Sequence, residues 1–340
     1  MAYRKSLLSE ARRIEIVEAE MPAEIPAGHA RLRLGTASIC GTDMHYFRHF
    51  ANAGFQLDYP ITLGHEACAY MVDGNGASIN EGALVAINPI IECGRCDRCA
   101  TGDINMCATK QFPGSATTKP HIDGFFREYF DFPVHNLHVV DPTTNPDHLT
   151  FTEPLACAMH CVRRAGITAD SSVLVTGCGP MGLLAVVGAA ALGAEVHVTD
   201  LKQGAIDVAQ SVGATNGFLI GNEGYMVPAN SYDVVIEASG SPHAYNQALE
   251  AVRKQGVVAV LSLIQPSPVP INLHLVALKE ITTIGSILYT DDFVAALDLI
   301  QSGNVDFDRL IGGRFSVSQT QSACEFMAGG EAIGKVLIKP

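Results

Sequence analysis

The chain has 340 residues, of which 48% are hydrophobic and 17% charged, and its formal net charge is −13. The length predicts two domains, and the composition excludes a disordered chain. The negative charge, without any block of Lys or Arg, argues against nucleic acid or an anionic membrane as a partner and favours a small-molecule ligand.

The sequence shows neither a secretory signal at residues 1–20 nor an apolar run long enough to span a membrane. Residues 1–20 alternate charged and apolar side chains and lack the apolar stretch of a secretory signal, which predicts a cytoplasmic location. The longest apolar run, residues 181–194, is interrupted by three glycines and is shorter than the ~20 residues that span a bilayer. We therefore predict a buried helix there.

In chain order, the predicted secondary structure changes once, from a region of short strands to a region in which strands and helices alternate. Residues 31–140 read as short strands, such as residues 84–87, between turns rich in Gly, Pro, Asn and Asp. After residue 153, apolar strands and Ala/Leu-rich helices alternate, which predicts βαβ units on a parallel, doubly wound sheet. The expected strands are 172–176, 195–199, 233–237 and 257–263, and the expected helices are 181–192, 205–211 and 244–252. A final β segment at 333–338 predicts that the chain returns to the first domain.

The fold class predicted is therefore α/β, with two domains. A β-rich domain comprises residues 1–152 and 285–340, and a Rossmann domain comprises residues 153–284.

A four-cysteine motif lies inside the β-rich region. Cys93, Cys96, Cys99 and Cys107 have the spacing C-x2-C-x2-C-x7-C, which suits tetrahedral zinc with Zn–S distances of ~2.3 Å. A site closed by four thiolates has no open position for substrate, so we expect structural zinc there. An iron–sulfur cluster is the alternative, although no paired second motif accompanies these cysteines.

A glycine motif opens the predicted Rossmann domain. An apolar strand runs into Gly177-Cys-Gly179-Pro180-Met181-Gly182 and then into an apolar helix, the context that dinucleotide binding requires. Asp200 ends the next strand, where a carboxylate binds both ribose hydroxyls and repels a 2′-phosphate. NAD is therefore favoured over NADP, and nearby Lys202 weakens this preference slightly.

Three further segments carry metal-ligand residue types: Cys40-Gly-Thr42-Asp-Met-His45, Gly64-His65-Glu66 and Glu153-Pro-Leu-Ala. In this order, with the four-cysteine loop between them and the glycine motif after them, they resemble the zinc-dependent medium-chain alcohol and polyol dehydrogenases. The similarity is greatest to the polyol branch, which includes sorbitol dehydrogenase and L-idonate 5-dehydrogenase. It extends over essentially the whole chain.

The resemblance implies a GroES-like catalytic domain, a catalytic zinc in addition to the structural one, and hydride transfer to NAD from a secondary hydroxyl. It implies Cys40, His65 and Glu153 as catalytic zinc ligands. It further implies that Glu66 lies next to the metal and exchanges with Glu153 or with water as a ligand. Thr42 and His45 match the family's proton relay.

The resemblance also implies four residues beside the substrate: Tyr46, Phe112, Leu288 and Tyr289. Leu288 stands where the polyol enzymes carry an Arg that contacts the polar end of the substrate. Its loss removes up to five hydrogen-bond donors and a fixed charge, so idonate itself is in doubt.

Several readings remain open at this point. The substrate is a polyol or sugar acid, or another secondary alcohol of the sorbitol, cyclic polyol or threonine type. A metal-free NADPH quinone reductase and a catalytically silent binding protein are alternatives, and the intact metal and relay residues argue against both. A homo-oligomer, dimer or tetramer, is expected, with residues 257–287 supplying a strand edge for pairing.

Overall fold

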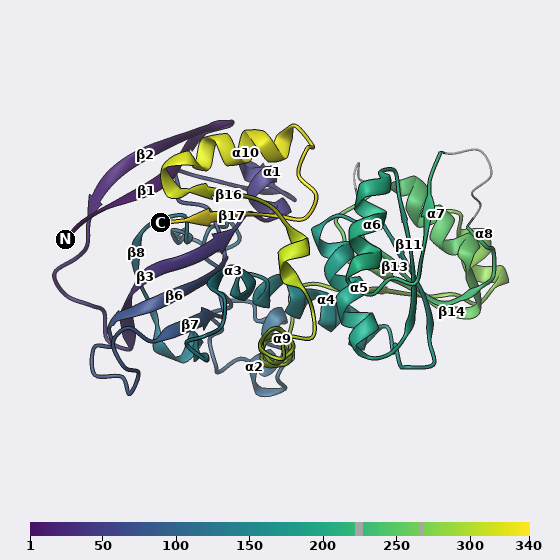
Figure 1. Ribbon diagram of the computed structural model, residues 1–340, viewed down its shortest axis with the longest axis horizontal. Helices are drawn as coiled ribbons and strands as arrows, with labels where there is room; N and C mark the ends of the chain where they lie inside the picture. The colour runs from purple at the N-terminus through teal and green to yellow at the C-terminus, as the bar shows by residue number, and fades with distance from the viewer. Residues whose placement is uncertain (222–226, 265–267) are drawn as a thin grey trace. The chain divides into compact units, whose positions relative to one another are not determined.

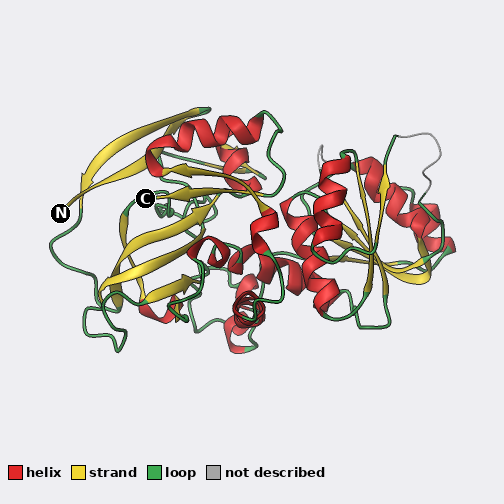
Figure 2. Cartoon of the chain, in the orientation of Figure 1, coloured by secondary structure: helices red, strands yellow, loops and turns green. Residues whose placement is uncertain are grey.

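The computed structural model describes residues 1–221, 227–264 and 268–340, and the chain divides into two compact units (Figures 1 and 2). The first unit joins Met1–Glu153 to Phe293–Pro340, and the second is Pro154–Asp292. Residues 285–292, which the sequence assigned to the first domain, belong here to the second unit.

A seven-stranded sheet is the frame of the first unit. Its strands follow the order β16-β17-β3-β6-β7-β9, and β8 also pairs with β3. The bounds are β3 His29–Ser38, β6 Glu66–Asp73, β7 Leu84–Ile87, β8 Tyr129–Pro133, β9 Leu137–Val139, β16 Ile311–Ser316 and β17 Lys335–Lys339.

Smaller elements complete this unit. A hairpin is formed by β1 (Ala2–Glu10) and β2 (Arg13–Glu20), and a short pair by β4 (Ala51–Asn52) and β5 (Phe55–Gln56). The helices are α1 (Gly41–His49), α2 (Asp97–Ala100), α3 (Pro146–Leu149) and α10 (Thr320–Ala328). Two longer helices, α4 (Thr152–Arg164) and α9 (Asp292–Gln301), begin at the two points where the chain passes from one unit to the other.

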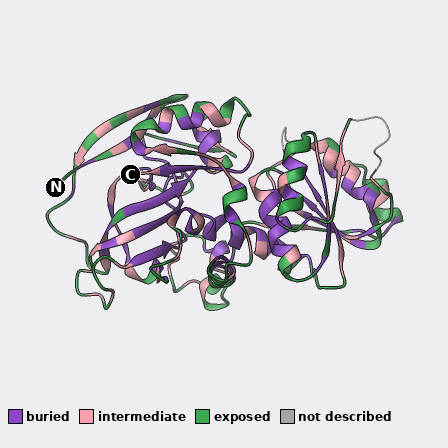
Figure 3. Cartoon of the chain, in the orientation of Figure 1, coloured by how far each residue is buried: buried purple, intermediate pink, exposed green. Residues whose placement is uncertain are grey.

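The strand pattern of the first unit follows from alternation. On β3, Ala30, Leu32 and Leu34 are completely buried, because alternate side chains of a strand point to the same face. They join one apolar core with aromatic residues of the 125–132 region, including Phe125 and Phe130. Figure 3 shows buried residues running along the strands of both sheets.

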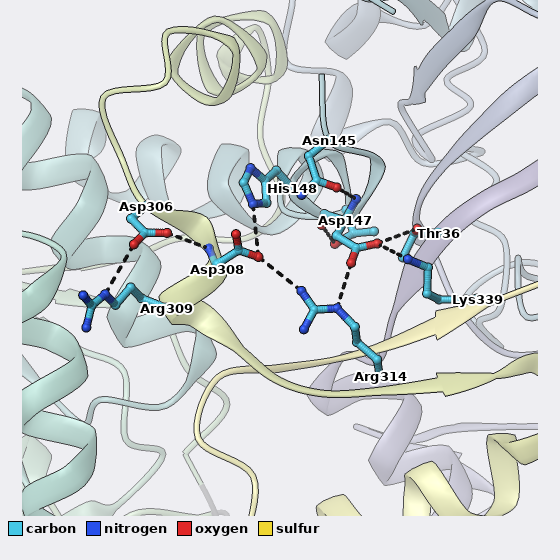
Figure 4. Close-up of polar contacts among 10 residues, drawn as sticks. Thr36, Asn145, Asp147, His148, Asp306, Asp308, Arg309, Arg314 and Lys339 are labelled. Atoms are coloured by element: carbon cyan, nitrogen blue, oxygen red, sulfur yellow. Dashed lines mark hydrogen bonds and ion pairs between the residues drawn. The ribbon is translucent and has the colours of Figure 1, made fainter. Parts of the chain in front are cut away.

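A buried carboxylate connects one helix of the first unit to three strands (Figure 4). Asp147 on α3 accepts hydrogen bonds from Thr36 Oγ1 on β3 at 3.0 Å, Arg314 Nε on β16 at 2.8 Å and Lys339 Nζ on β17 at 2.8 Å. Burial opposes ionisation, but these hydrogen bonds hold the pKa of Asp147 below its ordinary value. The cluster therefore fixes α3 to the sheet immediately before the helix that carries Glu153.

The second unit is a six-stranded parallel sheet with helices, in the order β12-β11-β10-β13-β14-β15. This order, with two halves diverging from the first strand, is that of a Rossmann fold and confirms the predicted class. The strands are β10 Ser172–Thr176, β11 Glu195–Asp200, β12 Asn216–Leu219, β13 Tyr232–Glu237, β14 Val252–Val260 and β15 Thr282–Gly285. The helices are α5 Pro180–Ala191, α6 Gln203–Ser211, α7 Pro242–Ala251 and α8 Leu273–Leu278.

The apolar run at 181–194 is largely helix α5, whose residues from Gly182 to Ala189 are buried. Within the described parts of the chain, no helix is both long enough and apolar enough to cross a membrane.

Candidate active site and cofactor site

Three of the predicted metal-site residues converge in the first unit. One ligand atom each from Cys40, His65 and Glu66 lie within 4.8 Å of one another. Cys40 is the N-cap of α1, and His65 and Glu66 stand where the chain enters β6. Residues 25 positions apart in the sequence are thus brought together by the start of a helix and the start of a strand.

Asp43, which the sequence analysis did not single out, connects these two segments. Its carboxylate accepts hydrogen bonds from the backbone N–H of Cys40 at 2.8 Å and of Gly64 at 3.0 Å. One of its oxygens lies 3.7 Å from Nδ1 of His65, which is beyond hydrogen-bond distance, so Asp43 acts on this imidazole through its charge. The sequence feature that could have pointed to Asp43 is its position inside the Cys40–His45 motif.

The electrostatics of this cluster suit a divalent cation. Burial alone would lower the pKa of His65, but the negative charges of Asp43, Cys40 and Glu153 raise it to about 10. The field that favours a proton on this imidazole also favours a metal ion at the same place. Thiolate, imidazole and carboxylate are donors that zinc accepts in catalytic sites, so these residues fit zinc.

Glu66 is completely buried, and each of its oxygens already has a partner. Lys335 Nζ on β17 pairs with one oxygen, and Ser38 Oγ on β3 donates to the other. Lys335 is itself buried, and although burial lowers its pKa, the charges of Glu66 and Cys40 raise it overall. Neither partner was predicted, because a Lys in a C-terminal strand gives no sign of an ion pair with a residue 269 positions away.

Glu153 is buried near the start of α4 but is not part of the group of ligand atoms within 4.8 Å. Its negative charge contributes to the raised pKa values of His65 and Lys335. Its role as a zinc ligand stays a prediction.

The two relay candidates lie on α1. Thr42 and His45 are half-buried and three residues apart, so they share one face of the helix. Burial lowers the pKa of His45, and the charges of Arg48 and His49 add to this effect.

The four substrate candidates divide between the units. Phe112 lies beside the metal cluster, with its ring 5.1 Å from that of His65. Tyr46 is completely buried, and its hydroxyl lies 3.2 Å from Ser115 Oγ and accepts a hydrogen bond from the backbone of Ala116. In the second unit, Tyr289 is completely buried and Leu288 is half-buried with a φ of 50°.

The four-cysteine loop gathers its sulfur atoms as the spacing predicts. Ligand atoms of Cys93, Cys96, Cys99 and Cys107 lie within 4.8 Å of one another. The sulfurs of Cys93 and Cys99 are 3.9 Å apart and those of Cys96 and Cys99 are 3.5 Å apart. Four sulfurs ~2.3 Å from tetrahedral zinc are about 3.8 Å apart, so the loop fits this metal.

The glycine motif lines a cavity of about 590 Å³ in the second unit. Gly177 has a φ of 88°, and a Cβ on Gly182 would lie 1.8 Å from Gly177 O, so only glycine fits the third position. A Cβ on Gly179 would meet nothing within 4 Å. The motif therefore leaves open space at Gly179, where α5 begins with Pro180 and Met181 and backbone N–H groups are available to a pyrophosphate.

Asp200 lines the same cavity and is held by the backbone. Its carboxylate accepts hydrogen bonds from the N–H of Cys178 at 2.7 Å and of Lys202 at 2.9 Å. It therefore connects the glycine loop to the end of β11. His243 and Gln247 on α7 also line the cavity. Sequence reasoning missed both, because polar residues in a helix that follows a strand carry no cofactor signature.

Comparison with family models agrees with this geometry. Residues 26–142 match the alcohol dehydrogenase GroES-like domain, and residues 180–302 match the zinc-binding dehydrogenase domain.

Among curated proteins, D-xylulose reductase A of Aspergillus niger is 31% identical over 314 residues, covering 88% of this chain and 86% of the relative. Sorbitol dehydrogenase of Bacillus subtilis strain 168 is 29% identical over 330 residues, covering 94% of this chain and 92% of the relative.

Solved structures give the same result. L-idonate 5-dehydrogenase of Escherichia coli has a TM-score of 0.94 at 25% identity and covers 100% of this chain and 99% of its own. A protein of Sinorhizobium meliloti 1021, described as a zinc-binding dehydrogenase and solved with NADP, has a TM-score of 0.87 at 30% identity and covers 100% of both chains. The chain therefore belongs to the zinc-dependent medium-chain alcohol and polyol dehydrogenase family and is an oxidoreductase that uses zinc and a nicotinamide cofactor.

Proposed function

We propose that the chain oxidises a secondary hydroxyl on a polyol or sugar acid, with NAD as hydride acceptor, in a reaction of the L-idonate 5-dehydrogenase type. The observation that carries the proposal is the cluster of half-buried Cys40 with buried His65 and Glu66, in a chain whose relatives include sorbitol dehydrogenase and L-idonate 5-dehydrogenase. Glu153 completes the proposed ligand set.

Zinc and NAD, when bound, supply a Lewis acid that lowers the pKa of the substrate hydroxyl and an acceptor for the hydride. The chain itself orients and shields the reacting group. Asp43 fixes the two ligand-bearing segments, and the ring of Phe112 lies beside His65, where it excludes water.

Thr42 and His45 are proposed to move the proton of the substrate hydroxyl to solvent. Thr42 Oγ1 passes the proton on, and an imidazole nitrogen of His45 receives it, since burial lowers the pKa of this half-buried imidazole and leaves it neutral, with a nitrogen free to accept a proton, at pH 7. His45→Gln should lower kcat/KM about 100-fold at pH 7, with partial recovery at higher pH. If the ratio of kcat/KM between wild type and His45→Gln did not change with pH, the relay would be contradicted.

NAD is the proposed cofactor because Asp200 presents a carboxylate in the glycine-loop cavity. That charge repels a 2′-phosphate. The Sinorhizobium relative was solved with NADP, so the preference has to be measured on this chain. Asp200→Ala should bring the dissociation constants of NADH and NADPH closer together. An unchanged ratio would remove Asp200 as the determinant.

A structural zinc is proposed at the four-cysteine loop, with no part in the reaction. The sulfur separations support a closed tetrahedral site. Metal analysis should give two zinc ions per chain, and a value of one would leave this loop without its proposed metal.

The substrate is proposed to be a polyol of low charge, because Leu288 cannot bind a carboxylate as an Arg does. The experiment is an absorbance screen for NADH or NADPH formation against polyols, inositols, sugar acids and simple secondary alcohols, with and without a zinc chelator. Chelator-sensitive NADH production from an uncharged polyol supports the proposal. Production from sugar acids alone would keep the dehydrogenase reaction but contradict a substrate of low charge. Activity restricted to simple alcohols would move the substrate outside the polyol branch.

Homo-oligomerisation is proposed through β15, which lies at the edge of the second unit's sheet with mostly exposed residues. An edge strand offers unpaired backbone groups to a second copy. A monomer mass in gel filtration with light scattering would remove this proposal.

A further inference from the structure

The C-terminal half of α4 holds both ends of a short segment that follows β15. Arg164 Nε donates to the carbonyl of Gly285 at 3.1 Å, at the beginning of this segment. At its end, Arg163 Nε donates to Asp292 Oδ1 at 2.8 Å, and the same guanidinium donates to Thr290 Oγ1 at 2.8 Å. Helix α4 therefore anchors residues 285–292 at two points.

The second anchor is a triad of buried His160 and Asp292 with half-exposed Arg163. His160 Nδ1 lies 2.9 Å from Asp292 Oδ2, and both side chains are less than a tenth exposed. Burial opposes the charge on Asp292, but hydrogen bonds from His160 and Arg163 hold the pKa of its carboxyl well below its ordinary value. Asp292 also accepts a hydrogen bond from the backbone N–H of Thr290 at 3.3 Å. A buried carboxylate with this many donors holds its position firmly.

The anchored segment has an unusual backbone. Leu288 adopts a φ of 50°, in the left-handed region that a branched side chain rarely occupies, and the next residue, Tyr289, is completely buried. A residue persists in such a conformation only when its surroundings enforce it. The two anchors on α4 lie on either side of Leu288 and supply that enforcement.

We propose that the cluster of His160, Arg163, Arg164 and Asp292 is a clamp that sets the conformation of residues 286–290 and thereby determines which substrates the enzyme accepts. The inference rests on the proposed function, in which Leu288 faces the substrate, and on the resemblance, which implies the same for Tyr289. The clamp residues act through that segment and are positioning residues.

The test compares Arg163→Met with wild type. Met keeps the apolar stem of Arg163 but removes the hydrogen bonds that its guanidinium donates to Thr290 and Asp292. Arg163→Lys is the conservative variant, because an ammonium can pair with Asp292 but has no planar fork to bind Thr290 as well. Arg253→Met is the matched control: Arg253 Nε bonds Asp233 at 2.6 Å in the same unit and is similarly half-exposed.

Three quantities are measured on the zinc-loaded enzyme: KM and kcat for sorbitol, xylitol and the other polyols oxidised by wild type, the dissociation constant of NADH by fluorescence, and amide hydrogen exchange of residues 286–290. A displaced positioning segment should raise the polyol KM of Arg163→Met about 10-fold or more and change the order of preference among polyols. NADH affinity should change less than about 2-fold, and exchange at 286–290 should be faster. Arg163→Lys should lie between, and Arg253→Met should match wild type.

Unchanged polyol KM values and preference in Arg163→Met, with wild type active, would overturn the clamp and leave the proposed function intact. An equal loss in Arg253→Met would also overturn it, because the effect would then be one of general stability. If wild type oxidises no polyol, the proposed function fails, and the clamp's role in selecting substrates fails with it.

Discussion

The two clusters of metal-ligand residues are built in opposite ways. The cysteine loop takes all four ligands from residues 93–107, and three of its cysteines are only half-buried. The Cys40, His65 and Glu66 cluster takes ligands from two separate segments and is deeply buried at His65 and Glu66. One site is local and accessible, and the other is assembled by the fold.

The partners of the ligands show the same contrast. Nearby groups within the loop, the backbone of Arg95 and the side chain of Thr109, lower the pKa of Cys93 to about 6. Around the other cluster, Asp43, Ser38 and Lys335 hold the ligands from separate elements. We therefore expect the loop to need its proposed metal to keep its shape, whereas the Cys40, His65 and Glu66 cluster is held in place by partners from other elements. Mutations should distinguish the two sites accordingly.

The largest effect is expected at the buried cluster. His65→Ala removes a ligand and the imidazole, so kcat/KM should fall about 1000-fold or more, since the Lewis acid is lost from the reacting hydroxyl. The melting temperature should change little, because the cluster's long-range partners remain. Steady-state kinetics, calorimetry and metal analysis measure this. An equally large loss of stability would show that this metal, too, is structural.

The reverse effect is expected at the cysteine loop. Cys96→Ser should lower stability by about 2–4 kcal/mol, because metal-binding energy is folding energy where the site is not preformed. Zinc content should fall from two ions to one, with kcat close to wild type in the protein that remains folded. Denaturant unfolding and metal analysis measure this. A variant with full stability and one zinc would contradict a structural role.

This contrast also explains what the sequence can predict. The cysteine spacing and the glycine motif are contiguous, and each predicts its geometry, because the ligands or turns lie within a few residues of one another. The alternation of strands and helices likewise predicts the Rossmann sheet. These parts of the fold depend on local patterns.

Long-range partners give no such pattern. Lys335 pairs with Glu66 across 269 positions, and only the pairing of β17 with β3 and of β3 with β6 brings them together. The clamp on residues 285–292 is similar, since His160 and Asp292 are 132 positions apart. Asp43 is intermediate, because it lies within a recognised motif but its bond to Gly64 depends on the fold.

A smaller effect is expected from Asp43→Asn, which weakens the Cys40, His65 and Glu66 cluster without removing a metal ligand. Asp43→Asn leaves one acceptor oxygen, so the N–H of Cys40 or of Gly64 loses its partner. Zinc affinity at the catalytic site should fall about 10–100-fold, as is usual for groups that orient metal ligands. Competition with a chromophoric chelator measures the affinity, and the cysteine-loop zinc serves as an internal control. Equal weakening at both sites would mean that the substitution loosens the whole unit.

The smallest effect is expected from Asp147→Asn, which separates general stability from both metal sites. Asp147 binds no proposed metal, and Arg314 and Lys339 are partly exposed, so stability should fall by only about 1–2 kcal/mol with two zinc ions retained. Because the pKa of Asp147 is lowered in the fold, its contribution is complete above the unfolded value of about 3.9 and is lost as pH falls through the lower folded value. The stability difference between the two proteins, measured by urea unfolding, should therefore be constant from pH 8 to about pH 5 and shrink at more acidic pH. A difference that grows on acidification would show that Asp147 is protonated in the native state, and a loss of zinc would show that α3 supports a metal site directly.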